Sequence, residues 1–127
     1  MPTERDIQNR ILVALSRCGA TVFRQNTGMG WVGTVVHKGK YRLILEDYRP
    51  LHAGLCKGSS DIIGWRPLII TPEMVGQRVA VFVAVEVKSA AGRATQAQKN
   101  FIRVVKEDGG LADVARSIEQ AVEIVEI

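Results

Sequence analysis

Apolar residues near the start of the chain recur at the three- and four-residue spacing of an amphipathic helix. This pattern predicts a helix over residues 3–18, and the residues that share its apolar stripe are Ile7, Ile11, Leu12, Leu15 and Cys18. Thr3 with Asp6 is an acidic variant of the capping box that opens a helix. Gly19 suits the left-handed residue just past the end of a helix.

Two further helix starts are predicted where a Thr or Ser is followed three residues later by Gln. The pairs are Thr95 with Gln98 and Ser117 with Gln120. The first helix should end near residue 108, where two glycines follow, and the second should run through residue 125.

Alternating or β-branched apolar segments predict strands at residues 21–26, 34–38, 41–45, 62–65, 79–87 and 111–114. The two segments that flank Gly39 are expected to form a hairpin. Residues 79–87 are nearly continuous Val, Ala and Phe, which is typical of a central strand buried on both faces. The glycine-rich residues 27–33 and the longer segment 46–60 are expected to be loops. The order of elements predicts a mixed α/β domain.

Composition indicates the number of domains and the cellular compartment, but it does not indicate the reaction or the ligand. The 127 residues suit one domain spanning residues 1–127, and 17 Lys and Arg against 13 Asp and Glu give a net charge of +4. That excess permits a polyanionic partner but does not identify one. The start of the chain lacks the apolar stretch of a signal peptide, and no apolar run approaches the roughly 20 residues of a membrane helix. With two cysteines and no disulfide framework, we expect a reduced, cytoplasmic protein with no membrane partner.

Two charged residues interrupt the apolar pattern where it is strongest. Glu86 and Lys88 end the apolar run two residues apart, so a strand places both on one face. Asp61 stands beside another apolar segment, and the two carboxylates can converge if these segments are neighbouring strands. Two close carboxylates repel each other, and a bound divalent cation usually offsets this repulsion. Because the ligands are oxygens, Mg²⁺ or Mn²⁺ is favoured. A lysine beside them suits phosphodiester hydrolysis.

The alternative is that the strand simply reaches the surface there. Glu86 and Lys88 would then pair with each other or with Arg93.

Several motifs together resemble the VRR-NUC family of the PD-(D/E)XK nuclease superfamily. They are Gly58-Ser59-Ser60-Asp61-Ile62-Ile63-Gly64, Val85-Glu86-Val87-Lys88-Ser89, Gly92-Arg93, and Gln98 with Phe101. The resemblance covers most of the chain and is to the small stand-alone members of bacteria and phages. It implies a restriction-endonuclease-like core, with a mixed central β-sheet flanked by helices. Ser60 stands where the superfamily name expects proline, a proline that members of this family often lack.

The resemblance also implies a role for individual residues. It implies a metal site whose ligands are Asp61, Glu86, the Val87 carbonyl and Glu4. Lys88 matches the catalytic lysine and Gln98 a glutamine near it. Glu4 has the alternative of stabilising a helix start by its charge, and Gln98 that of a capping-box partner.

Polar residues around these motifs are candidate DNA contacts: Arg24, Asn26, Ser89, Arg93, Lys99 and Arg103. Lys99, Arg103 and Lys106 recur at helical spacing, so they form either a solvated face or a phosphate-binding stripe. Trp31 in the glycine-rich segment is a candidate for stacking on bases, whereas Trp65 is expected in the core. A zinc site from two Cys and two His, residues 18, 37, 52 and 56, is disfavoured because these residues lack close pairs.

These observations predict a DNA endonuclease, a hydrolase that depends on Mg²⁺ or Mn²⁺ and uses Asp61, Glu86 and Lys88. The resemblance implies branched or Holliday-junction DNA as substrate, a role in DNA repair in a bacterial cell, and a homodimer. The alternative is a non-catalytic nucleic-acid-binding module that keeps the nuclease fold. A third hypothesis is a small metal-binding interaction domain that does not bind DNA.

Overall fold

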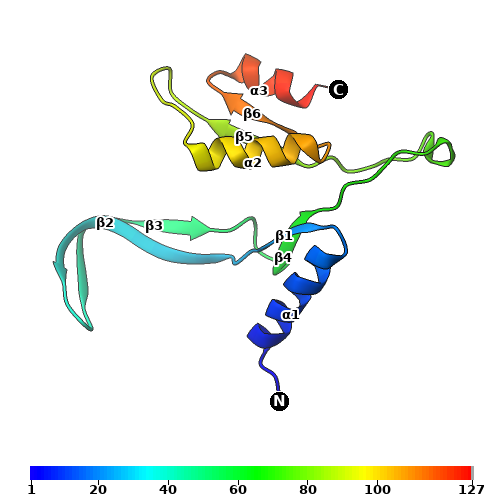
Figure 1. Cartoon of the computed structure of the whole chain (residues 1–127). Coiled ribbons are helices and arrows are strands. Elements are labelled where there is room, and N and C mark those ends of the chain that lie inside the picture. Colours follow the sequence, from blue (N-terminus) through cyan, green and yellow to red (C-terminus); the bar gives the residue numbers. More distant parts are fainter. Residues whose placement is uncertain (127) are drawn as a thin grey trace. The chain divides into compact units, whose positions relative to one another are not determined.

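The computed structural model describes residues 1–126 and divides the chain into two compact units, Met1–Gly64 and Trp65–Ile127 (Figure 1). The elements of these residues are α1 (Glu4–Arg17), β1 (Thr21–Arg24), β2 (Gly28–Lys38), β3 (Leu43–Ala53), β4 (Ile62–Trp65), a 3₁₀ turn (Pro72–Met74), β5 (Val83–Val87), α2 (Gln96–Glu107), β6 (Leu111–Ala115) and α3 (Ile118–Val125). The strands pair as β1 with β4, β2 with β3, and β5 with β6. The predicted mixed α/β fold is confirmed, while the prediction of one domain stays a prediction.

Local capping signals explain where the helices begin. In α1 the backbone N–H of Asp6 donates to Thr3 Oγ1 at 3.1 Å, and the Thr3 N–H donates back to Asp6 Oδ2 at 2.9 Å. Gly19 follows the helix with φ +89°, a conformation that glycine adopts at little cost. No helix within residues 1–126 combines the length and the apolar character that crossing a membrane requires.

The antiparallel pair of β2 and β3 is a ribbon of 11 residues in each strand, which corrects two predictions. Residues 28–33 and 46–53 were expected in loops, yet they extend the hairpin around Gly39. The ribbon needs a glycine at position 33, where the register shifts, because a Cβ there would lie 2.7 Å from the Glu46 carbonyl oxygen. Pro50 is tolerated because each strand of a two-stranded ribbon has an outer edge.

In the second unit, β5 lies parallel to β6, and α2 and α3 both contact this pair. Val105, Ala112 and Ala115 are the buried core of the unit. The prediction that the apolar run is a strand buried on both faces is wrong, since Val83 and Val87 are 44% and 75% exposed. The strand has one neighbour, β6, among the described residues, so its outer positions remain accessible.

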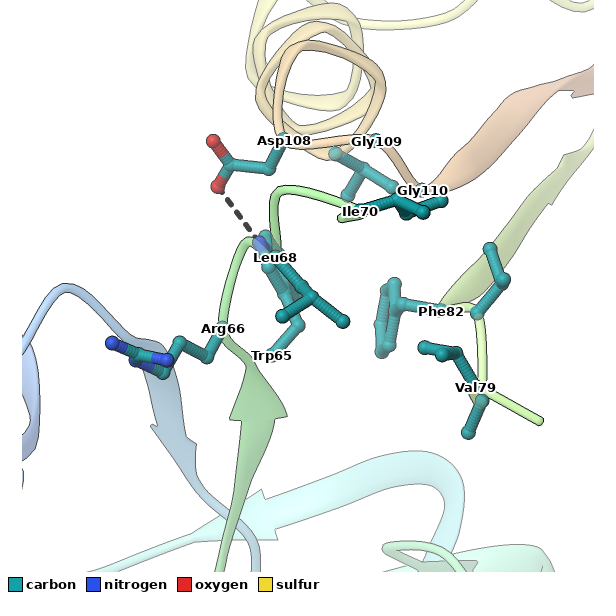
Figure 2. Close-up of a pocket in the computed structure, with 12 residues that line it drawn as sticks. Trp65, Arg66, Leu68, Ile70, Val79, Phe82, Asp108, Gly109 and Gly110 are labelled. Atoms are coloured by element: carbon teal, nitrogen blue, oxygen red, sulfur yellow. Dashed lines mark hydrogen bonds between the residues drawn. The ribbon is translucent and has the colours of Figure 1, made fainter. Parts of the chain in front are cut away.

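Trp65 contacts two aromatic side chains of this unit, of which Figure 2 shows Phe82. The Trp65 ring lies 4.6 Å from Phe82 and 6.0 Å from Phe101, measured between ring centroids. Its indole N–H donates to Asp108 Oδ2 at 2.8 Å, at the end of α2. Trp65 also lines a pocket of about 260 Å³. Trp65 makes these contacts but is only half-buried, so the prediction that it belongs to the buried core is wrong.

We expect Gly64→Ala to destabilise the protein by about 1–3 kcal/mol, the usual cost of forcing an extra carbon into a packed position. A Cβ at Gly64 would lie 1.9 Å from the Thr21 carbonyl oxygen and 2.7 Å from Val22 Cα, and backbone atoms cannot easily move. Urea denaturation measures the change. Gly28→Ala is the matched control, because a Cβ there meets nothing within 4 Å. Equal stability of the two variants would contradict the prediction.

We expect Asp6→Asn to weaken the start of α1 at neutral pH and to lose that effect in acid. Hydrogen bonds from the Thr3 backbone and hydroxyl lower the pKa of the Asp6 carboxyl below its ordinary 3.8. A carboxyl with a lowered pKa stabilises the fold above its unfolded pKa, and this stability disappears as the pH falls through the folded pKa. Urea midpoints of both proteins should therefore differ at pH 7 and converge below 3.8. A difference independent of pH would contradict this account.

Candidate active site

Glu86 and Lys88 lie at the end of β5 and form an ion pair. Lys88 Nζ is 3.3 Å from Glu86 Oε1, and the two side chains are 20% and 31% exposed respectively. Their two-residue spacing puts them on one face of the strand, as the alternation of side chains predicts. Glu86 therefore pairs with Lys88 rather than with Arg93, the other partner considered.

Gln98, in the first turn of α2, supplies a second donor to the same carboxylate oxygen. Its Nε2 amide donates to Glu86 Oε1 at 2.9 Å. Its Oε1 accepts from the Thr95 backbone N–H at 2.8 Å, and its own N–H donates to Thr95 Oγ1 at 3.1 Å. Gln98 is thus both a capping-box residue and a contact of Glu86, while its role in catalysis stays a prediction.

The carboxylate of Glu86 is held on one side only. Both donors, from Lys88 and Gln98, approach Oε1, and within the described residues Oε2 accepts no hydrogen bond. Glu86 and Gln98 line a hollow of about 400 Å³, together with Ala84, Val85, Ala97, Phe101 and Ile102. The site thus offers a fixed, partly exposed carboxylate oxygen at the edge of a mostly apolar hollow.

Asp61 immediately precedes β4, and the buried side chain of Gln25 fixes the loop before it. The Asp61 carbonyl accepts from the Gln25 backbone N–H at 2.7 Å. Gln25 Nε2 donates to Ser59 Oγ at 2.7 Å and to the Ser60 carbonyl at 3.1 Å, while its Oε1 accepts from the Leu55 N–H at 3.0 Å. Four hydrogen bonds of one residue therefore fix the backbone that carries Asp61.

Gln25 is a site-positioning residue that sequence reasoning missed. It is 8% exposed, and both ends of its side-chain amide form hydrogen bonds with residues between Leu55 and Ser60. A polar residue at the end of a short strand is commonplace, so the sequence carries no signal for this role. Position 54 next to this side chain requires glycine for two reasons. Its φ is +85°, and a Cβ there would lie 2.3 Å from Gln25 Oε1.

The five candidate catalytic residues are divided between the two units. Glu4, in the first turn of α1, and Asp61 belong to the first unit. Glu86, Lys88 and Gln98 belong to the second, where they are in mutual contact through Glu86. Within residues 1–126, no three His, Cys, Asp or Glu side chains lie close enough together to hold a metal ion. The assignment of Asp61 and Glu4 to one site with Glu86 stays a prediction.

Three of the candidate DNA contacts already have partners in the chain. Arg24 donates to the Asn9 side chain, and Arg103 pairs with Glu107 at 3.0 Å on the exposed side of α2. Ser89 Oγ accepts from the Gly92 N–H at 3.2 Å. An exposed ion pair of this kind contributes little to stability and does not prevent a phosphate contact.

The other three candidate DNA contacts, Asn26, Arg93 and Lys99, are exposed. Their binding to DNA stays a prediction, as it does for the partnered three.

The residues considered for zinc do not gather. In the β2–β3 register His37 lies opposite Ile44 near one end, and His52 lies opposite Met29 near the other. Both cysteines are exposed free thiols. Trp31, the candidate for base stacking, is 55% exposed, and its ring meets Tyr48 edge-on at a centroid distance of 5.4 Å.

Comparison with known proteins identifies one family. The sequence profile of the VRR-NUC domain matches residues 35–119, which is more than half of the chain. The matched range contains Asp61, Glu86, Lys88 and Gln98, and it leaves out Glu4. Neither the curated proteins nor the solved structures contain a match.

We expect Gln98→Glu to lower the free energy of unfolding by about 1–2 kcal/mol at neutral pH. A glutamate at position 98 still accepts from the Thr95 N–H, so the capping box survives, but the donor to Glu86 is replaced by a second negative charge. Gln96→Glu is the matched control: it adds the same charge to the same helical turn, at a side chain that contacts Asn100 instead. Urea denaturation of both variants separates the effects. Equal stabilities would show that the Glu86 contact adds nothing.

Proposed function

Because the chain belongs to the VRR-NUC family of nuclease domains, we propose that it is a DNA endonuclease that depends on a divalent metal ion. It hydrolyses phosphodiester bonds in DNA. The observation that carries the proposal is the carboxylate of Glu86, held by Lys88 and Gln98 at the end of β5. This arrangement fits the acidic residue and lysine of the nuclease motif, and its contacts place a cation and an amide around one carboxylate oxygen.

The donor atoms suit Mg²⁺ or Mn²⁺. The residues that would hold the ion are Asp61, Glu86, Val87 through its carbonyl, and Glu4. All of these donors are oxygens, which these hard cations prefer. Glu86 Oε2, which accepts no hydrogen bond within the described residues, is the oxygen left for such a ligand. When bound, the ion acts as a Lewis acid on the phosphoryl oxygens.

The residues of the chain then have separate tasks. A water oxygen attacks phosphorus and releases a proton to solvent, the bond from phosphorus to the leaving oxygen breaks, and the leaving oxygen takes up a proton from solvent. The Lys88 ammonium holds the attacking water and offsets the negative charge that develops on the phosphoryl group. Gln98 is a positioning residue, since its amide keeps Glu86 in one orientation without contacting substrate.

We further propose branched DNA, such as a Holliday junction, as the preferred substrate, and a homodimer as the active form, with a role in DNA repair. The family membership supports this choice. A symmetric junction needs two cuts, and a two-fold dimer presents two equivalent sites for them.

The test is a cleavage panel with fluorescent four-way junction, flap and duplex DNA, in Mg²⁺, in Mn²⁺ and in EDTA. We expect cleavage only with a divalent ion, and a loss of roughly 10²–10³-fold for Lys88→Ala and Glu86→Gln, as for removal of other groups that stabilise a transition state. Asp61→Ala should lose activity as well.

Matched controls separate loss of chemistry from loss of charge. Arg78→Ala and Glu123→Gln each remove one charge from an exposed residue of the same unit and should cleave like the wild type. Absence of divalent-dependent cleavage on every substrate would overturn the proposal. Binding of DNA that ignores both metal and Glu86→Gln would favour the non-catalytic module instead.

A further inference from the structure

The net positive charge of the chain resides in one of its two units. Residues 1–64 hold nine Lys and Arg against five Asp and Glu, whereas residues 65–127 hold eight of each. The unit that carries Glu86, Lys88 and Gln98 is therefore neutral as a whole. Attraction for a polyanion must originate mainly from the first unit, which does not contain Glu86, Lys88 or Gln98.

Within the first unit, the tip of the β2–β3 ribbon has an unbalanced positive charge. Lys38, Lys40 and Arg42 lie within five residues, and the stretch from Gly28 to Leu45 contains no Asp or Glu. All three cations are exposed. Within the described residues none of them forms an ion pair. The tip therefore presents three cations to solvent with no anionic partner.

An aromatic side chain accompanies these cations. Tyr41 is 86% exposed at the tip, and Lys40 Nζ lies 5.2 Å from the centre of its ring. A flat apolar ring beside cations suits a surface on which sugars and bases lie next to phosphates. The loop is held in shape by the Gly39 N–H, which donates to the Arg42 carbonyl at 2.8 Å.

The ribbon also has the dimensions of a groove-binding element. Eleven residues per strand span at most about 35 Å at roughly 3.3 Å per residue. This length is about one turn of B-DNA. The major groove admits a two-stranded β-ribbon. The two register shifts, between Val32 and Thr34 and between Val35 and His37, bend and twist the ribbon, and its curvature is visible in Figure 1.

We propose that the β2–β3 ribbon is a DNA-binding arm whose tip, Lys38, Lys40 and Arg42, contacts the phosphates that flank a groove of duplex DNA. The proposal rests on DNA being the substrate, as proposed above, and it adds a binding element separate from the hydrolytic residues. A second copy of the chain is a poorer occupant, because exposed lysines on a ribbon oppose pairing of its edges with another strand.

The experiment measures binding of the whole chain to a short fluorescent DNA duplex in EDTA, so that no cleavage intervenes, across a series of salt concentrations. The arm variant is Lys38→Gln with Lys40→Gln and Arg42→Gln. Each lost phosphate contact reduces the slope of log affinity against log salt by about 0.9, so we expect a reduction of about 2–3 and an affinity at least tenfold weaker.

A matched control removes the same charge from elsewhere in the same unit. Arg5→Gln with Arg10→Gln and Arg17→Gln changes three exposed arginines of α1. This variant should lose less than threefold in affinity. A charge-conserving variant, Lys38→Arg with Lys40→Arg and Arg42→Lys, should bind like the wild type and so excludes a folding defect at the tip.

Each outcome has a distinct meaning. Equal losses for the arm variant and the α1 variant would overturn the arm, because net charge alone would then explain binding. An equal loss on duplex RNA of the same sequence would overturn groove binding, since the major groove of RNA is too narrow. An altered oligomeric state of the arm variant in light scattering, with unchanged DNA binding, would assign the ribbon to a second copy.

The same proteins separate this inference from the proposed activity. Wild-type cleavage together with unchanged binding by the arm variant overturns the arm and leaves the nuclease. Arm-dependent binding without wild-type cleavage overturns the nuclease and leaves the arm.

Discussion

The contact between the Gln98 amide and the Glu86 carboxylate is the interaction on which the candidate site depends. It joins the first turn of α2 to the end of β5, so the capping box that starts the helix also orients the acidic group. An amide is neutral, and it therefore holds the carboxylate without cancelling its negative charge. Lys88 approaches the same oxygen, and within the described residues Oε2 accepts no hydrogen bond. The residue that caps the start of α2 thus also orients the carboxylate of Glu86.

Local signals account for what the sequence predicted well. The capping boxes at Thr3 and Thr95 involve residues three apart, and both are present with the expected hydrogen bonds. The pairing of Glu86 with Lys88 follows equally from the two-residue period of a strand. In each case the interaction partners are close in sequence, so the pattern alone contains the information.

Features that depend on distant partners were not predictable in this way. Gln25 bonds to residues 30 to 35 positions away, and nothing near it marks that role. The glycines of β2 led to the prediction of a loop. Gly33 is required because the backbone of β3 approaches it closely, and this approach exists only once the two strands pair. The exposure of Val87 likewise depends on which strands lie beside β5. Its apolar side chain alone therefore does not predict whether it is buried.

The division of charge along the chain has an evolutionary consequence. The ribbon of residues 28–53 contributes no residue to the mutual contacts of Glu86, Lys88 and Gln98, which lie wholly within residues 65–127. The charge of the ribbon tip and the contacts around Glu86 can then vary independently of each other. Drift in the length or charge of this one hairpin would then change which nucleic acids the protein binds, while the contacts around Glu86 stay the same.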